Sequence, residues 1–353
     1  METSSPASAT GLSGGWIRLV AWGLVVCAVG IFVWVNRADL PVALHAIRGA
    51  HLGWLAAAAG CTGIYLVGQA GMYAETFRAV KLEGSVARML RPSLAAGALN
   101  IVSKSAGMGG LPVFLAEGRR RGQPGGLVTT AYTGVVVVSH ATFTLTLALV
   151  FVMMWFDGHL TRLELAAGGV FGVYAVAQAV LLLSAVRSRE ACRRVFRLAG
   201  MATHAVRRAL GRTRAPFSPV DAAADELFDT LASLRRSPAQ LMGVLAWGMV
   251  VEFAGAALLW CVARALGEPL SPAGALAGYA MTVLFSTVGA LPGGLGFAEV
   301  SLGAVLSGYG MSVPSIAATV VLYRVGEMWI PLAAGLVALR LGGDRIGSRG
   351  DVG

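Results

Sequence analysis

A few ionisable side chains interrupt segments of this chain that are otherwise apolar. Glu252 lies in one long apolar run, and Arg324 and Glu327 lie together in the last one. Each costs about 2.5–3.5 kcal/mol at the centre of a membrane helix on insertion scales, so such residues usually serve a polar pathway. Arg324 and Glu327 are three residues apart, hence on one helical face, and can form an ion pair. The pair either lines a pathway or only braces neighbouring helices.

Three glycines precede a further acidic residue, Glu299, and indicate a break between two helices. The glycines are Gly293, Gly294 and Gly296, and Pro292 comes directly before them. A helix that starts inside a membrane exposes unpaired N–H groups and a positive dipole end, which favour an anion such as a lipid phosphate. Glu299 either caps those N–H groups or pairs with Arg324 or a substrate. We expect Arg324 to bind the phosphate while Glu299 and Glu327 hold it in place.

Polar residues also interrupt an earlier apolar stretch, around residues 104–110. Asn100, Lys104 and Glu117 lie near this second candidate break, and His140 lies in the middle of the apolar run that follows. A single histidine inside a membrane is as readily an interhelical hydrogen bonder as a proton carrier. We include all four among the residues expected to bind substrate.

No set of residues has the spacing of a catalytic or metal site. The four cysteines, Cys27, Cys61, Cys192 and Cys261, are far apart, and no P-loop or nucleophile–base–acid set stands out. We therefore expect neither a metal nor a cofactor, and a protein that is not an enzyme.

The composition explains where these residues must lie. The 353 residues are 56% hydrophobic and 13% charged, whereas a soluble domain is about 25% charged. This excludes a soluble enzyme, a secreted disulfide scaffold and a disordered protein. The net charge of +10 suggests nucleic acid only for a soluble protein; here it indicates Lys and Arg kept on the cytoplasmic side of a membrane.

Apolar length predicts an all-α, polytopic membrane protein with six full spans, since a helix needs about 20 apolar residues to cross the bilayer. The spans are expected at 19–35, 53–73, 127–156, 165–186, 241–263 and 314–338. Two further stretches, 92–118 and 274–310, are each interrupted in the middle and predict pairs of half-helices. Lipid permits such irregular backbone only where protein buries it or a wet cavity adjoins it.

The basic residues predict the orientation of the chain. Twenty-two of the 28 Lys and Arg residues fall in segments that alternation places on one side, including 187–240 and both termini. The positive-inside rule makes that side cytoplasmic, in the inner membrane of the cell. We expect one integral membrane domain over 1–353, beginning with an uncleaved anchor.

The same count constrains the two interrupted stretches. Each must enter and leave the membrane on one side, the first from the cytoplasm and the second from outside, as inverted re-entrant hairpins. Residues 109–117 and 293–299 also echo each other in sequence. An inverted-topology repeat of about 53–156 and 241–338 is predicted, a plan common in transporters; a chance match of short Gly-rich strings is the alternative.

The segment 187–240 contains 11 arginines. Apolar residues at helical spacing over 189–211 suit a helix lying on an anionic inner leaflet, and a solvated basic loop is the plainer interpretation.

The string from Ala290 to Glu299, followed by Val321-Leu322-Tyr323-Arg324, resembles the signature of the lysylphosphatidylglycerol synthase transmembrane family. This family includes the flippase domain of the multiple peptide resistance factor. The resemblance implies that these residues belong to the polar core of a lipid translocator. The residues carried over are Pro292, Gly293, Gly294, Gly296, Glu299 and Arg324. The resemblance does not extend to the aminoacyl transferase domain, and we expect none in this sequence.

The chain also departs from the family's pattern. Relatives commonly carry Gly-Glu-x-x-Arg in the first hairpin and a Glu-Arg pair in the next helix. This chain has Ala116-Glu117-Gly118-Arg119 and Ser139-His140 at those places. The head group is therefore open among aminoacylated phosphatidylglycerol, another phospholipid, a polyprenyl-linked lipid and a hopanoid.

These observations predict a flippase-like lipid translocator whose partners are membrane lipids, anionic or phosphate-bearing, and not nucleic acid. A lipid-synthesis enzyme and a second copy of the chain are the protein partners that this function allows. An ion or small-solute transporter, an intramembrane transferase acting on lipid-linked substrates and a non-catalytic partner of a lipid-synthesis enzyme are the alternatives.

Overall fold

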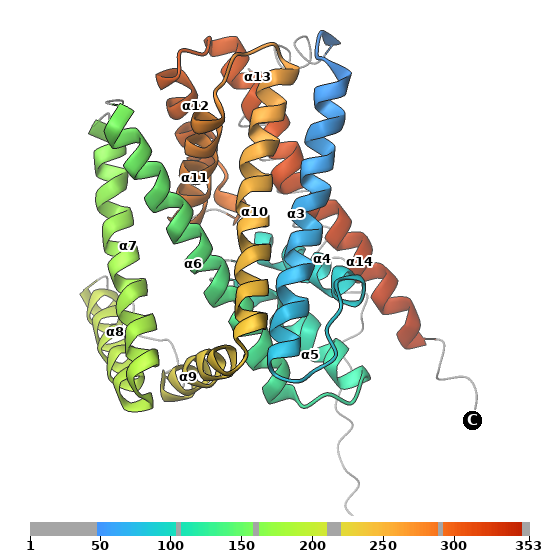
Figure 1. Ribbon diagram of the computed structural model, residues 1–353, viewed down its shortest axis with the longest axis vertical. Coiled ribbons are helices and arrows are strands. Elements are labelled where there is room, and N and C mark those ends of the chain that lie inside the picture. Colours follow the sequence, from blue (N-terminus) through green and yellow to red (C-terminus); the bar gives the residue numbers. More distant parts are fainter. Residues whose placement is uncertain (1–47, 104–106, 158–161, 210–219, 289–291, 348–353) are drawn as a thin grey trace, which may run out of the picture.

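A computed structural model describes residues 48–103, 107–157, 162–209, 220–288 and 292–347, and every regular element in these ranges is a helix (Figure 1). The span expected at 19–35 and the candidate residue Lys104 lie outside the described residues.

Four helices of the described chain are long and apolar enough to cross a membrane. They are α3 (Leu52–Ala79), the first part of α6 (Gly125–Asp157), α10 (Pro238–Ala265) and a continuous helix over Val313–Leu341. The last consists of α13 (Val313–Arg324), a π-helical turn η3 (Val325–Trp329) and the start of α14 (Ile330–Gly347). The span expected at 165–186 is helical, as α7 (Arg162–Arg187), and its described part includes the apolar stretch Gly172–Ser184.

Both interrupted stretches are divided into two helices. The first contains α4 (Val86–Val102), a 3₁₀ turn η1 (Met108–Gly110) and α5 (Leu111–Arg120). The second contains α11 (Pro272–Val288), a 3₁₀ turn η2 (Pro292–Gly294) and α12 (Phe297–Gly308). In Figure 1, α4 and α5 occupy the middle and lower part of the molecule, whereas α11 and α12 occupy the upper part.

The buried side chains form two main clusters. One joins α3, α4, α5 and α6 with part of α10, and the other joins α6, α10, α11, α12 and α13. The long helices α3 and α10 lie along each other, and α14 lies along α4. Small residues permit this approach, because a Cβ at Gly68 would come within 2.9 Å of Val251 and one at Gly71 would overlap Trp247.

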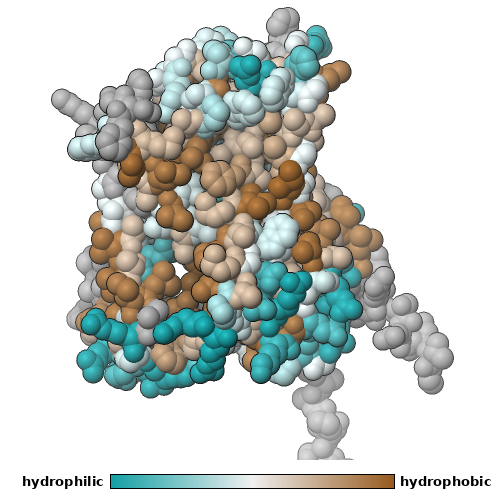
Figure 2. All heavy atoms as spheres, viewed as in Figure 1, coloured by the Kyte–Doolittle hydropathy of each residue, from teal (hydrophilic) through white to brown (hydrophobic). Residues whose placement is uncertain are grey.

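The surface has an apolar belt. In Figure 2 hydrophobic residues cover the middle of the molecule, and the strongest hydrophilic band runs along the lower edge, over α5, α8 (Arg189–Ala209) and α9 (Val220–Arg236). Large exposed apolar side chains such as Leu145, Val173, Val176 and Leu183 face outward from α6 and α7. A surface of this kind is stable in lipid, since water would expose too much apolar area.

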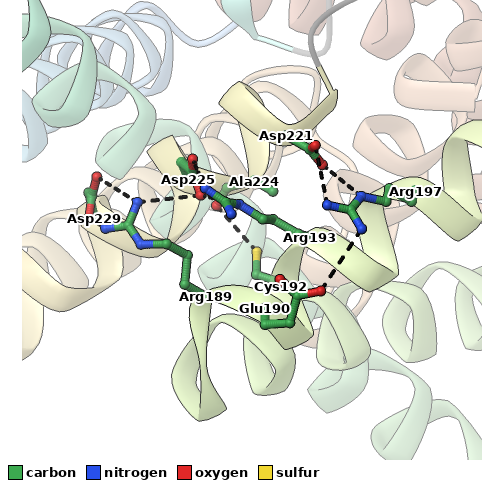
Figure 3. Close-up of polar contacts among 9 residues, drawn as sticks. All are labelled: Arg189, Glu190, Cys192, Arg193, Arg197, Asp221, Ala224, Asp225 and Asp229. Carbon is green, nitrogen blue, oxygen red and sulfur yellow. Dashed lines mark hydrogen bonds and ion pairs between the residues drawn. The ribbon is translucent and has the colours of Figure 1, made fainter.

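The described part of the Arg-rich segment is a pair of helices, not a loop. Arginines of α8 face aspartates of α9 in an antiparallel ladder with a spacing of four residues on each helix (Figure 3). Arg193 donates to Asp225 through Nε and Nη2, at 2.8 and 2.6 Å. Arg197 donates to Asp221 at 2.9 Å, and Arg189 pairs with Asp229. Three arginines for which the sequence suggested contact with lipid or solvent are thus paired with the aspartates of α9.

The pair of helices is attached to α6 through α9. Thr133 donates to Glu226 at 2.8 Å, and Thr230 donates to the Thr130 carbonyl at 3.2 Å. Between α8 and α9, the buried Cys192 thiol contacts the Ala224 carbonyl at 3.4 Å.

We expect the Asp225→Asn variant to expose Cys192 to a maleimide about two- to fivefold faster than wild type at neutral pH, because exposed ion pairs are weak. The Arg193 guanidinium holds the pKa of Asp225 below its usual range. The pair therefore stabilises the α8–α9 contact above the ordinary Asp range, and this contribution is lost as the pH falls through the lowered pKa. Mass spectrometry of the labelled thiol measures the rate. Glu190→Gln is the control, since Glu190 makes only contacts of 3.7 and 3.9 Å; equal rates in both variants would show that the ladder does not hold the helices.

Candidate functional site

One cavity of about 430 Å³ lies where the two groups of helices meet. Its walls come from α3, α4, α6, α7, α10 and α11, from η3 and α14, and from the breaks in both interrupted stretches. Met72 and Val251 of one buried cluster and Tyr279 of the other all face it. Broken backbone is permitted at membrane depth where it is buried in protein or adjoins a cavity.

Asn100 organises the break of the first stretch. Its carbonyl oxygen accepts the Gly110 N–H at 2.8 Å, and its amide nitrogen donates to the Tyr132 hydroxyl at 3.1 Å. Tyr132 in turn donates to the Gly107 carbonyl at 2.5 Å. One side chain of α4 and one of α6 therefore satisfy backbone groups that the break leaves without helical partners.

Arg324 organises the break of the second stretch. Its side chain is 1% exposed and forms ion pairs of 2.8 Å with Glu299, through Nε, and with Glu327, through Nη1. Nη2 donates to the Gly293 carbonyl at 2.7 Å. All three guanidinium nitrogens are thus engaged by protein, and Arg324 is not among the residues that line the cavity.

Glycine is required in the second break. Gly293 and Gly294 have φ of 62° and 68°, a left-handed conformation that side chains with a Cβ rarely adopt. The next helix begins after Gly296, whose N–H donates to Glu299 Oε2 at 2.6 Å. The sequence left open whether Glu299 is a cap or an ion-pair partner, and its two oxygens do both: Oε2 caps the helix and Oε1 pairs with Arg324.

Glu252 on α10 also lines the cavity. The residue is only 5% exposed, and its carboxyl Oε2 accepts a hydrogen bond from the Tyr279 hydroxyl at 3.0 Å. Tyr65 and Gln69 of α3 line the same cavity and are hydrogen-bonded to each other at 3.4 Å.

His140 on α6 also lines the cavity. Its Nδ1 donates to the Val136 carbonyl at 2.7 Å; because a carbonyl only accepts, Nδ1 carries the hydrogen. The His140 ring lies 6.3 Å from that of Tyr174, and Thr144 hydrogen-bonds Gln178, so the α6–α7 contact is polar at this level.

The structure sorts the residues selected from sequence into three groups. Asn100, His140, Glu252, Gly293 and Glu327 line the cavity. Glu299, Arg324, Gly294 and Gly296 lie at the second break behind it, where Pro292 begins η2. Glu117 lies on α5 with Arg121 at 2.8 Å and Arg120 at 3.7 Å and does not reach the cavity.

Sequence reasoning missed Tyr65, Gln69, Tyr174 and Tyr279, which also line the cavity. A signal was present for three of them: Tyr65 and Gln69 are four residues apart, and Tyr174 stands four residues before Gln178, so each apolar span presents two polar groups on one face. Tyr279 carries no such pattern.

The charges that line the cavity differ from those expected of a site that binds an anion. Its lining, over the described residues, includes the carboxylates Glu252 and Glu327 but neither Lys nor Arg. The binding of phosphate by Arg324 therefore stays a prediction, and it requires a conformation in which Glu299, Glu327 or Gly293 releases the guanidinium.

The sequence matches a known protein family over most of its length. The family model for the lysylphosphatidylglycerol synthase TM region matches residues 20–335, which include both breaks and all the cavity residues. No curated protein matches the chain. Since the match covers most of the sequence, the chain belongs to the family of the lysylphosphatidylglycerol synthase transmembrane region.

Proposed function

We propose that this protein is a flippase-like translocator that moves a phospholipid, an aminoacylated phosphatidylglycerol or a related lipid across the cytoplasmic membrane. The observation that carries the proposal is the cavity of about 430 Å³ that both broken stretches line and that the carboxylates of Glu252 and Glu327 also face. Figure 2 shows the surface hollowed between α7 and α10, above the hydrophilic lower edge. A head group could occupy such a cavity while the acyl chains stay in lipid.

The proposal includes a topology. The α4–α5 and α11–α12 pairs are re-entrant hairpins entering from opposite sides, and they meet at the cavity because Gly293 approaches Ile101 at the end of α4. The lower edge, with α8 and α9, and both termini face the cytoplasm. In this arrangement each hairpin contributes a broken backbone to one central site.

Reconstitution in liposomes with labelled lipids of several head groups tests the proposal. We expect the purified protein to move at least one labelled lipid from the inner to the outer leaflet faster than empty liposomes do. No acceleration for any phospholipid, aminoacylated, polyprenyl-linked or hopanoid lipid would contradict it. Chemical conversion of the lipid instead of movement would favour an intramembrane transferase.

Gly97 offers a way to fill the cavity without disturbing the helices. It lines the cavity on α4, and a Cβ added there meets no heavy atom within 4 Å. We expect Gly97→Leu to leave folding unchanged and to slow translocation by about tenfold or more, since the side chain occupies space for the head group. The matched control is Gly60→Leu on α3, which is exposed and equally unhindered. An equal loss of translocation rate in both variants, or no loss in either, would show that transport does not use this cavity.

A further inference from the structure

The buried carboxylates of the membrane region differ in how they are neutralised. Glu299 and Glu327 share Arg324, each with an ion pair of 2.8 Å. Glu252 has no such partner among the contacts of the described residues and is bonded to the neutral hydroxyl of Tyr279 at 3.0 Å. It is nonetheless 5% exposed and faces the cavity.

Among the described residues, neither Lys nor Arg lines the cavity around Glu252. The titratable side chains that line the same cavity are Tyr65 and Tyr73 on α3, His140 on α6, Tyr174 on α7, Tyr279 on α11 and Glu327 on η3, and Tyr323 on α13 also lies near Glu252. The Nδ1–H of His140 is directed to the Val136 carbonyl. Arg324, which follows Tyr323 on α13, is engaged by two other carboxylates and a carbonyl.

An ionised carboxylate in this position would be costly. Burying an unpaired charge carries a penalty of several kcal/mol even after relaxation, and a group so placed takes up a proton instead. The Tyr279 hydroxyl can hydrogen-bond Glu252 in either protonation state, because it can donate to a carboxylate or to the carbonyl oxygen of the acid. A proton on Glu252 can leave only when water or a polar group enters the cavity beside it.

We propose that Glu252 is a proton-exchange site: it is protonated when the cavity is closed and empty, releases the proton when the cavity opens to water or a head group, and thereby couples translocation to proton movement. The coupling rests on the proposed function, whereas the proton on Glu252 does not. The step forms and breaks only the O–H bond of the acid, with water as the proton acceptor.

The first test addresses the proton itself. Dicyclohexylcarbodiimide is an apolar reagent that modifies protonated carboxyl groups, and peptide mass spectrometry identifies the residue. We expect modification of Glu252 that decreases as the pH is raised, and several-fold less at Glu299 and Glu327, which are ion-paired with Arg324. The Glu252→Gln variant should lose this modified peptide while the protein remains folded. Absence of modification at Glu252, or modification that ignores pH, would overturn the proposal.

The second test addresses the coupling, in liposomes with an entrapped pH indicator and a labelled lipid. We expect an imposed pH gradient to change the wild-type translocation rate several-fold and not to change the rate of Glu252→Gln. The control is Glu83→Gln, whose side chain is 74% exposed and far from the cavity, and which should respond to the gradient as wild type does. Translocation by wild type that ignores the gradient would overturn the coupling and leave the proposed function intact. A lack of any lipid movement would instead contradict the proposed function, while the carbodiimide result still decides the protonation of Glu252.

Discussion

The Arg324→Ala variant is expected to yield far less folded protein than wild type, because it leaves two carboxylates buried without their counter-ion. Glu299 and Glu327 would each lose an ion pair of 2.8 Å, and the Gly293 carbonyl would lose its donor. Breaking a buried charge pair typically costs about 3–5 kcal/mol, a large share of the stability of one domain. Fluorescence-detected size-exclusion chromatography of detergent extracts, with thermal challenge, measures the folded fraction.

A charge-free triple variant separates this cause from general damage. In Arg324→Met with Glu299→Gln and Glu327→Gln, the uncompensated charges are gone, and replacing a whole buried ion network is often nearly neutral. The amide of residue 299 can still accept the Gly296 N–H. We expect the triple variant to recover much of the folded protein that Arg324→Ala loses.

The matched control is Arg264→Ala, since Arg264 is exposed at the end of α10. Normal folding of Arg324→Ala would contradict a bracing role. Arg324→Lys adds a second criterion: an unchanged rate of translocation per folded molecule supports bracing, whereas a reduced rate supports the contact with a lipid phosphate.

Gly294→Ala should be the most damaging single change in the second break. The residue has φ of 68°, and an added Cβ would lie 2.8 Å from Cβ of Ser286 and closer still to its backbone. Strain and overlap therefore act together, at about 1–3 kcal/mol for each. We expect a lower unfolding temperature and a reduced yield of folded protein.

Alanine substitutions at two neighbouring glycines are expected to cause less damage, and they serve as comparisons. Gly296 has φ of 84° with open space around it, so Gly296→Ala should show the effect of strain alone. Gly308, near the end of α12, has neither restriction, and Gly308→Ala should be almost neutral. An order of damage other than Gly294, then Gly296, then Gly308 would show that the break does not have the described geometry.

Hydropathy and the positions of glycine and proline in the sequence were sufficient to locate most helices. The expected runs at 53–73, 241–263 and 314–338 fall within candidate spans and the run at 127–156 overlaps the fourth, Gly125–Met153, since apolar length is a local property of the chain. The two breaks were also predictable, because glycine and proline act on the backbone where they stand. The assembly of six spans and the re-entry of the hairpins remain predictions.

The charged residues were less predictable, because their effect depends on partners distant in sequence. The arginines of α8 suggested a leaflet or solvent, yet they face aspartates 24–40 residues away on α9. Arg324 suggested a phosphate ligand, yet it is enclosed by Glu299 and the Gly293 carbonyl, 25 and 31 positions earlier in the sequence.

The sequence by itself determined that this chain is a membrane protein, where its helices break, and which few charges lie inside. Only the tertiary structure decided which charges compensate one another and which residues share a cavity. The reason is physical: hydrophobic length and backbone freedom are set by adjacent residues, whereas the energy of a buried charge depends on the neighbours that packing places within a few ångströms. By that criterion Arg324 became the centre of a neutralised network, and Glu252 became the carboxyl on the cavity wall with a tyrosine, not an arginine, as its partner.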